Sequence, residues 1–437
     1  DYEEPLDILA HLMVGSEGTL GFISRVTLKT VPLYSQKATA LIFLPSIIEA
    51  ARLVPKLRKA GSSALEIMDD SALKAVRHLP GLPFDEDTYI APGSAALLIE
   101  YQSNDSQQLN SMVAAAVQII SEKHAASLPQ FFSNSVQRDK LWKVRRELGP
   151  LHAATRPPGT TVLSEDICFK VKDLARGIKD LKELFRRYAY DDAVIFGHAG
   201  DGNIHFKLSL DLDQEHTLDL YAVFMSELVD LVVDKYDGSL KAEHGTGRNM
   251  APFVEKEWGT TAYKIMLEIK KLLDPNGILN PDVLISRDDQ IHLKNIKPIP
   301  LVDEIIDPCI ECGLCEPACP SEDFSLTPRQ RIGVLREIEC LGETPGNESR
   351  VRRMQKAFRF SGVESCAVDS LCSMSCPVDI DTGLMMKKLR AESHGTPGKV
   401  IHGIAQKYFA ETIRSVRVLL RLIPPLRHAV RSQKIQQ

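Results

Sequence analysis

The cysteines constrain the fold of this 437-residue chain more than any other feature, because eight of the nine lie between Cys309 and Cys376. The remaining one, Cys168, stands alone. The chain opens with "DYEEPLDILA", which has neither the basic nor the apolar segment of a secretory signal. Clustered cysteines in such a chain indicate metal ligation rather than a disulfide framework.

The first cysteine run follows a known ligand spacing. Two residues separate each of the first three cysteines, three precede the fourth, and proline comes directly after it. This is the bacterial ferredoxin spacing, which predicts an iron–sulfur cluster. The alternative is a structural zinc site, but zinc favours Cys-x2-Cys pairs that lie far apart. The residues of this run are Cys309, Cys312, Cys315 and Cys319.

The second run keeps the same register with one substitution. Cys366, Cys372 and Cys376-Pro377 fit the template, and Asp369 occupies the place of the missing cysteine. The Asp369 carboxylate either binds the fourth iron or leaves that corner open, which would give a three-iron (3Fe-4S) cluster instead of 4Fe-4S. Either outcome would change the reduction potential, which depends on net charge and ligand type.

In two-cluster ferredoxins the cysteine before proline binds the other cluster. This rule predicts one cluster on the first three cysteines of the first run together with Cys376. The second cluster would use Cys319, Cys366 and Cys372, with or without Asp369. Cys340 fits neither run and is expected to be a buried helical cysteine. Two clusters carry single electrons, so another part of the chain must supply them.

The composition is that of an ordinary globular protein, with 44% hydrophobic and 25% charged residues and a net charge of −5. Strand-like and helix-like segments alternate from residue 38 to about 284, which predicts an α+β or α/β domain with helices packed on one sheet. Residues 22–31, "FISRVTLKTV", also alternate like a strand. The strand and helix pairs are "ATALIFL" with "SIIEAARLVPKLRKA", "SAALLIEY" with "QQLNSMVAAAVQIISEK", and "TTVLSEDICF" with "VKDLARGIKDLKELFRR".

Two histidines flank a predicted hairpin turn. In "AVIFGHAGDGNIHFKLSL" the Asp-Gly pair is a hairpin signal, and His198 and His205 stand on either side of it. Glu243 and His244 follow about 40 residues later, at an expected strand end before a Gly-rich turn. Two histidines and one carboxylate form an open site for a divalent metal. Asp201 competes as a ligand, but a role in the turn is the better interpretation.

The motifs "GHAGDGNIHF", "LKAEHGTGRNMAPFVEKEWG" and "DPNGILNPDVL" resemble the C-terminal substrate domain of FAD-linked oxidases of the vanillyl-alcohol-oxidase type. "GSEGTLGFISRVTL" resembles the last strand region of their FAD-binding domain. With the two cysteine runs and "LTPRQRI", the chain looks like the FAD- and iron–sulfur-dependent D-lactate dehydrogenases. D-2-hydroxyglutarate dehydrogenases and glycolate oxidase subunits are related families.

The resemblance implies a role for each matching residue. His198, His205 and Glu243 would bind the divalent metal (Zn, Mn or Fe), and His244 would be the general base for the 2-hydroxyl proton. Arg145 would clamp the substrate carboxylate, although without the resemblance it would be interpreted as a solvated helix charge. The FAD-binding residues implied are Gly15, Ser16, Gly18, Thr19, Gly21, Ile23 and Asn280.

The resemblance also bears on the substrate. Relatives of the hydroxyglutarate type carry a lysine for the distal carboxylate, and Ser164 occupies that place here. This favours a short acid such as D-lactate. The expected reaction is oxidation of a D-2-hydroxy acid to the 2-keto acid with hydride transfer to FAD. The two clusters would pass the electrons to a quinone or a cytochrome.

The expected fold is α+β: an antiparallel-sheet substrate (cap) domain with packed helices, preceded by the end of an FAD-binding domain and followed by a small α-helical two-cluster ferredoxin domain. Most of the family's FAD domain and its later cysteine-rich segments have no match in this sequence. The chain alone is therefore expected to be inactive. The expected boundaries are 1–33 for the end of the FAD-binding domain, 34–284 for the substrate domain, 285–308 for a linker, 309–390 for the ferredoxin-type domain and 391–437 for a basic helical tail.

From residue 387 onward, 11 Lys and Arg face two Glu. A helix near 409–423 would rest on an anionic membrane or, as the preferred alternative, pack on a downstream domain. The expected location is cytoplasmic, including the inner face of the cytoplasmic membrane, and no nucleic-acid-binding module is evident. Alternative functions are glycolate or D-2-hydroxyglutarate dehydrogenase, or an electron-transfer subunit of a split oxidoreductase with a vestigial substrate domain.

Overall fold

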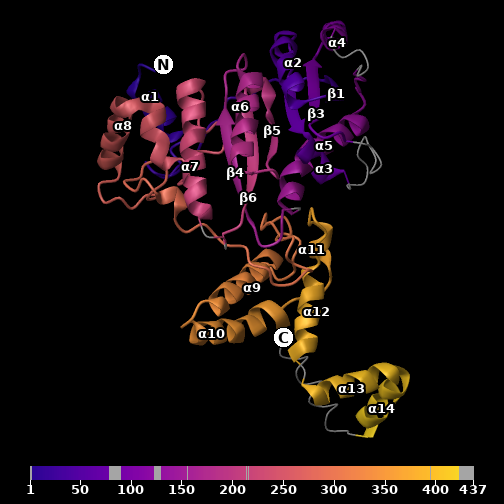
Figure 1. The fold of residues 1–437 in the computed structure, drawn as a ribbon. Helices are drawn as coiled ribbons and strands as arrows, with labels where there is room; N and C mark the ends of the chain where they lie inside the picture. The colour runs from indigo at the N-terminus through magenta and orange to yellow at the C-terminus, as the bar shows by residue number, and fades with distance from the viewer. Residues whose placement is uncertain are drawn as a thin grey trace. The chain divides into compact units, whose positions relative to one another are not determined.

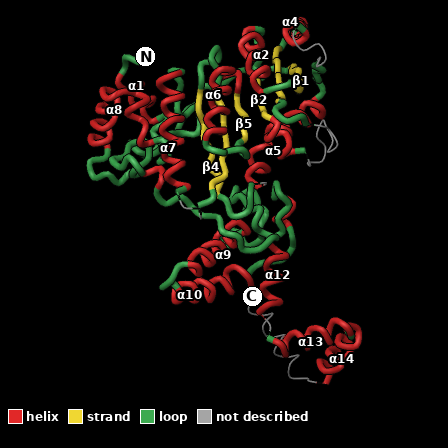
Figure 2. The backbone as a smooth tube through the Cα atoms, in the orientation of Figure 1, coloured by secondary structure: helices red, strands yellow, loops and turns green. Residues whose placement is uncertain are grey.

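The computed structural model describes residues 2–77, 90–122, 129–154, 156–212, 214, 216–393 and 395–422. The chain forms two compact units, Asp1–Leu301 and Val302–Gln437. Figure 1 shows the course of the chain, and Figure 2 shows that the strands drawn belong to the first unit.

One six-stranded antiparallel sheet organises the first unit, in the order β1-β3-β2-β5-β6-β4. The antiparallel substrate-domain fold expected from the sequence is confirmed, and three of the strands match the expected ones closely. The strands are β1 (Gln36–Leu44), β2 (Ala64–Asp69), β3 (Ala95–Ser103), β4 (Thr161–Cys168), β5 (Val194–His198) and β6 (Asn203–Leu210).

Eight α-helices accompany this sheet among the described residues of the first unit. Local sequence explains why α2 and α6 form: the Ser46 hydroxyl caps α2, and α6 buries Leu174, Ile178 and Leu181 at helical spacing. The helices are α1 (Pro5–Met13), α2 (Ile47–Lys59), α3 (Asp70–Val76), α4 (Ser106–Ser121), α5 (Ser135–Ala154), α6 (Leu174–Arg187), α7 (Thr217–Val229) and α8 (Val254–Leu273).

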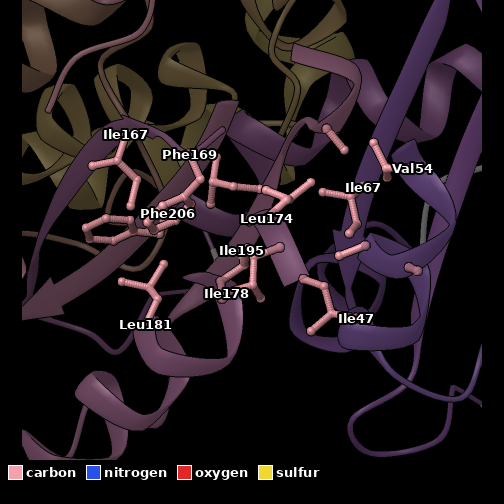
Figure 3. Close-up of a cluster of buried hydrophobic side chains, with 14 of the residues drawn as sticks. Ile47, Val54, Ile67, Ile167, Phe169, Leu174, Ile178, Leu181, Ile195 and Phe206 are labelled. Atoms are coloured by element: carbon pink, nitrogen blue, oxygen red, sulfur yellow. The ribbon is translucent and has the colours of Figure 1, made fainter. Parts of the chain in front are cut away.

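The main core lies between one face of the sheet and α2, α4, α6 and α7. Figure 3 shows its centre, where Ile67, Ile195 and Phe206 from the strands meet Ile47 and Leu174 from the helices. Burying each such side chain contributes about 1.5–3 kcal/mol, so this layer holds the sheet in place.

The opposite face of the sheet carries a smaller core and the polar residues of interest. Helices α3 and α5 cover β3, β2 and β5 there through a second apolar cluster. Side chains alternate along a strand, so when Ile204, Phe206 and Leu208 of β6 enter the main core, His205 and Lys207 face the other way. The candidate site therefore lies on the face that α5 partly covers.

Two expectations about the first unit need correction. Residues 22–31 form no strand, and the side chains of Phe22, Val26 and Leu28 are exposed, because no other described strand pairs with this extended segment. The segment expected as a linker, 285–308, contributes buried Ile291 and His292 to the first unit before the boundary at Leu301.

The second unit is helical in its described residues, as expected for the cysteine-rich segment. Its small core gathers Ile306, Ile332, Phe358, Met385 and Met386. None of the described helices is both long and apolar enough to cross a membrane. The helices are α9 (Pro328–Glu343), α10 (Glu348–Phe358), α11 (Leu371–Met374), α12 (Thr382–Ser393), α13 (Thr396–Lys407) and α14 (Phe409–Leu422), and the tail beyond residue 422 lies outside the described residues.

Candidate functional site

The predicted histidine hairpin forms through β5, a short turn and β6. His198 ends β5, Ala199–Asp201 makes a single 3-10 turn, and Gly202 follows with φ +79°. A Cβ at Gly202 would lie 1.9 Å from the backbone oxygen of Phe169, so only glycine fits there. The side chain of Asp201 is exposed, which agrees with a turn role rather than metal ligation.

The imidazoles of His198 and His205 converge on one carboxylate. Their Nε2 atoms lie 3.0 and 3.1 Å from Oε1 of Glu243, and the two rings meet edge to face with centroids 5.3 Å apart. The structure thus brings together the three residues predicted to bind metal, with both ring nitrogens close to one carboxylate oxygen. Three protein ligands with open positions are typical of catalytic metal sites.

One buried carboxylate lies beside the second ring nitrogen of each histidine. Oε1 of Glu66 lies 2.8 Å from Nδ1 of His198, and Oδ1 of Asp166 lies 3.3 Å from Nδ1 of His205. Carboxylates in this position fix the orientation of metal-binding histidines and increase their basicity. The hydrogen bond to Glu66 raises the pKa of His198, while burial opposes that shift.

Asp166 also positions the segment that carries Glu243. Its Oδ2 accepts the backbone N–H groups of Ala242 (3.0 Å), Glu243 (2.7 Å) and His244 (2.9 Å). Burial works to raise the pKa of Asp166, but the His205 contact and these N–H donors prevail and lower it. The expectation of a strand end here is wrong: the segment is a loop, since this carboxylate takes the N–H groups that a strand would pair.

A second grouping of potential ligands consists of Asp166, His205, Glu243 and His244, whose ligand atoms all lie within 4.8 Å of one another. Three N–H groups already occupy Oδ2 of Asp166, and the Asn203 amide donates to Oδ1. Asp166 is therefore better placed to hold the site than to bind metal. His198, the third predicted ligand, is not part of this grouping, and its role as a ligand stays a prediction.

His244 lies beside this point and is well placed to exchange a proton. Its ring stacks on that of His205 with centroids 4.7 Å apart, and its Nε2 is 3.8 Å from Oε1 of Glu243. The side chain is about half exposed. Burial lowers the pKa of His244, which favours the neutral imidazole that a general base requires.

Arg145 belongs to the site and is not a solvated helix charge. It projects from α5, its Nε donates to Oε2 of Glu66 at 2.8 Å, and its guanidinium lies 5.0 Å from the Phe196 ring centroid. The side chain is mostly buried. Glu66 thus links Arg145 to His198, and the two predicted residues share one carboxylate.

Lys207 also lies on the face of the candidate site, and the sequence analysis did not single it out. It lies two residues beyond His205 on the same face of β6 and pairs in register with Ser164 of β4. Its Nζ donates to the carbonyl of Gly149 on α5 at 2.7 Å. Burial and the nearby Arg145 lower its pKa to about 8. The signal was its spacing from His205, since a lysine on the site face of a buried strand is uncommon.

Residues implied to bind FAD gather at a turn beside the Glu243 loop. Ser16 and Thr19 are buried, and the Glu17 carboxylate accepts the N–H groups of Thr246 (2.7 Å) and Gly247 (2.8 Å). The side-chain amide of Asn280 donates to the carbonyl of Glu17. The structure therefore joins the turn at Gly15–Thr19 to Asn280, whereas Ile23 lies in the exposed extended segment.

The second unit brings the first set of cysteines together as the exchange rule predicts. One cavity is lined by Cys309, Cys312, Cys315 and Cys376. Burial raises the pKa of the Cys315 thiol to about 11, and Cys309 and Cys376 add to that shift. Four sulfurs from two distant runs around one cavity fit a 4Fe–4S cluster.

The remaining cysteines are linked less directly. Cys319 is followed by Ser321, whose hydroxyl donates to the carbonyl of Ser365, immediately before Cys366. Cys372 is buried on α11, with its sulfur 3.9 Å from Oδ1 of Asp381, an acidic residue that the sequence analysis did not single out.

Asp369, the predicted oxygen ligand, has an exposed side chain and accepts the N–H of Leu371 at 3.2 Å. Its role at a cluster stays a prediction. Cys340 lies in α9 and is half-buried, away from both runs in sequence.

Known proteins resemble the chain over nearly two thirds of its length. A mitochondrial D-lactate dehydrogenase [cytochrome] of Arabidopsis thaliana is 30% identical over 280 residues, which are 63% of this chain and 47% of that protein. Glycolate oxidase subunit GlcD of Bacillus subtilis is 28% identical, over 64% of this chain and 57% of its own. A mitochondrial D-2-hydroxyglutarate dehydrogenase of Arabidopsis thaliana is 28% identical, over 62% and 47%.

The chain spans about half the length of these curated relatives. A solved structure of alkyldihydroxyacetonephosphate synthase aligns with 62% of this chain and 48% of its own, at 15% identity and a TM-score of 0.41, which is too low to assign a fold. Residues 308–381 match the 4Fe-4S dicluster domain. Residues 33–284 match the model "FAD linked oxidases, C-terminal domain", so the chain belongs to that family.

Proposed function

We propose that the first unit is the substrate-binding part of an FAD-dependent dehydrogenase of D-2-hydroxy acids, with D-lactate as the first candidate. The observation that carries the proposal is the convergence of His198, His205 and Glu243, with His244 stacked beside them. Relatives named D-lactate dehydrogenase, glycolate oxidase subunit and D-2-hydroxyglutarate dehydrogenase support the class of substrate.

A divalent metal fits this donor set. His198 and His205 would offer Nε2, and Glu243 would offer a carboxylate oxygen, which are ligand types that suit Zn, Mn or Fe. A metal held there supplies Lewis-acid polarisation of the 2-hydroxyl and lowers its pKa. Glu66 supports the fit, since its carboxylate hydrogen-bonds Nδ1 of His198 at 2.8 Å, and the Asp166 carboxylate lies 3.3 Å from Nδ1 of His205.

The chain's own residues bind and orient the acid. Arg145 and Lys207 place two cationic groups over the site face, where a substrate carboxylate would bind. Nε2 of His244 would take the proton of the 2-hydroxyl, because its lowered pKa keeps the ring neutral near pH 7. FAD, when bound, would supply the hydride acceptor.

The second unit would pass the electrons on one at a time. The Cys309, Cys312, Cys315 and Cys376 set supports one iron–sulfur centre, and Cys319, Cys366 and Cys372 would hold the other. Below, these are called the first centre and the second centre. A quinone or a cytochrome is the proposed acceptor.

A longer acid, D-2-hydroxyglutarate, is the second candidate, and one observation favours it. Ser164 occupies the place where relatives of that type carry a lysine, but its cross-strand partner here is Lys207. Directly paired residues on one face have Cβ atoms about 4.5–5.5 Å apart. Lys207 can therefore serve a distal carboxylate from the neighbouring strand.

The test is metal content followed by ligand binding. Purified chain dialysed against Zn²⁺ or Mn²⁺ should retain one equivalent in the first unit, and His198→Ala or His205→Ala should abolish it. His216→Ala is the matched control, because His216 is an exposed histidine at the start of α7. Calorimetric titration of the metal-loaded chain should then show D-lactate binding more tightly than L-lactate. Equal affinity for both enantiomers, or a metal content in both histidine variants equal to that of the wild type, would refute the proposal.

A further inference from the structure

Helix α9 presents three arginines to the cysteine-rich segment, and two of them have carboxylate partners. Nε of Arg329 lies 3.0 Å from Oε2 of Glu316, and Nη1 of Arg336 lies 2.9 Å from Oε1 of Glu311. Each of these positive charges is neutralised by its neighbour. The third, Arg331, forms no ion pair with any carboxylate in the part of the chain that the structure describes.

Arg331 is nevertheless one of the most deeply buried side chains of the protein, at 1% exposure. Its Nε donates to the carbonyl of Gly362 at 2.8 Å, and its Nη1 donates to the sulfur of Cys319 at 3.7 Å. Its Nη2 has no hydrogen-bond partner among the described residues.

A guanidinium stays charged under all ordinary conditions, so Arg331 cannot lower the free-energy cost of its burial by losing its proton. An unpaired buried charge costs several kcal/mol, and natural structures compensate it with an opposite charge. The Cys319 sulfur is the nearest candidate for that charge. A neutral thiol is only a weak acceptor, whereas a thiolate bound to iron is negative and accepts hydrogen bonds.

We propose that Arg331 is the counter-charge of the second iron–sulfur centre and sets its reduction potential above that of the first centre. The inference rests on the proposed assignment of Cys319 to the second centre. One electron enters the centre on reduction and makes it more negative, while Arg331 keeps its proton. A fixed cation with an N–H directed at a ligand sulfur stabilises the reduced form more than the oxidised form.

Among the described residues, the two other arginines of α9 that lie beside the first centre are each paired with a carboxylate. Arg329 lines the cavity of Cys309, Cys312 and Cys315, but Glu316 cancels its charge, as Glu311 cancels that of Arg336. Net charge and hydrogen bonds to sulfur are the variables that separate cluster potentials. Electrons within the second unit would therefore collect on the centre that contains Cys319.

The experiment is a redox titration of the full chain after anaerobic reconstitution with iron and sulfide, with each centre followed by electron paramagnetic resonance. Arg331→Gln removes the charge, and Arg331→Lys keeps it without the planar fork. Arg329→Gln is the matched control, since it changes an arginine of the same helix beside the first centre. Iron and sulfide are quantified for every variant.

Arg331→Gln should shift the reduction equilibrium of the second centre at least tenfold toward the oxidised form, which is 59 mV for one electron. The reduction potential of the first centre should not change, and Arg331→Lys should shift the reduction equilibrium of the second centre less than tenfold. Arg329→Gln should leave the second centre unchanged. An unshifted second centre in a fully loaded Arg331→Gln variant would overturn the inference while leaving the two-centre assignment intact.

Two further outcomes are also decisive. If Arg331→Gln does not assemble the second centre, Arg331→Lys decides: a shift below tenfold supports the counter-charge, and a larger shift overturns it. Wild-type chain that binds iron for one centre only would overturn both the inference and the proposed two-centre path.

Discussion

Replacing Asp166 with asparagine tests whether one buried carboxylate holds the metal-binding residues in place. The wild-type side chain accepts three backbone N–H groups through Oδ2 and faces Asn203 and His205 through Oδ1. Asparagine can keep one oxygen for the N–H groups, but its own NH₂ then faces the Asn203 donor. The variant is nearly isosteric, so packing changes little.

The magnitude follows from these contacts. Hydrogen bonds to a charged acceptor are worth about 1.5–3 kcal/mol each and neutral ones about 0.5–1.5, so three weakened bonds lose about 3 kcal/mol in total. The opposed Asn203 donor adds about 1 kcal/mol, for an expected loss near 4 kcal/mol in the free energy of unfolding of the first unit. Release of the loop should also weaken Zn²⁺ binding about 10–100-fold, the usual effect of losing a residue that orients a ligand.

Urea unfolding measures the first effect, and competition with a chromophoric chelator measures the second in buffer where the variant is folded. Asp274→Asn is the matched control, because Asp274 is also buried and accepts two backbone N–H groups but touches no predicted metal ligand. If Asp166→Asn binds Zn²⁺ as tightly as wild type, the carboxylate does not orient His205 and Glu243, and the reasoning fails.

Three other perturbations have defined outcomes. Gly202→Ala should lower the melting temperature markedly and displace both hairpin histidines, because its Cβ would meet the Phe169 oxygen at 1.9 Å; an unchanged melting curve and Zn²⁺ affinity would contradict this. Burial raises the pKa of Asp69 from 3.8 to about 7, so the stability that its neutral form contributes is present below pH 4 and is lost as pH rises through 7. The urea midpoint of the wild type should therefore fall as pH rises from 4 to 7, and the midpoint of Asp69→Asn should lack this decrease. Lys207→Met should weaken D-2-hydroxyglutarate binding to the metal-loaded chain about tenfold or more while changing D-lactate binding less, and an equal loss for both acids would exclude a distal-carboxylate role.

The features that depend on local sequence could be predicted. The Asp-Gly turn predicts a hairpin with His198 and His205 flanking it, and the structure forms this hairpin with the two rings 5.3 Å apart. The exchange of Cys376 into the first cysteine set also follows from spacing, and these sulfurs line one cavity.

The features that depend on distant pairing could not be predicted. Strand β2 was missed because "ALEIMD" is a short apolar run with a charge in its middle, which does not distinguish helix from strand. Glu66 was missed for the same reason, because it contacts His198 only through the pairing of β2 with β5, which are more than 120 residues apart in the chain. The burial of Arg331 likewise depends on the approach of Gly362, 31 residues further along.

Glu17 connects the Gly15–Thr19 turn to the loop that follows His244 and to Asn280. Its carboxylate binds the N–H groups of Thr246 and Gly247, directly after His244, while its backbone carbonyl accepts from Asn280. Whatever orders the turn around Glu17 must favour the ordered form of the His244 loop by the same free energy, and the reverse holds equally. A ligand that orders the turn around Glu17 would therefore also stabilise the loop that carries His244, and the coupling would pass through the Glu17 side chain.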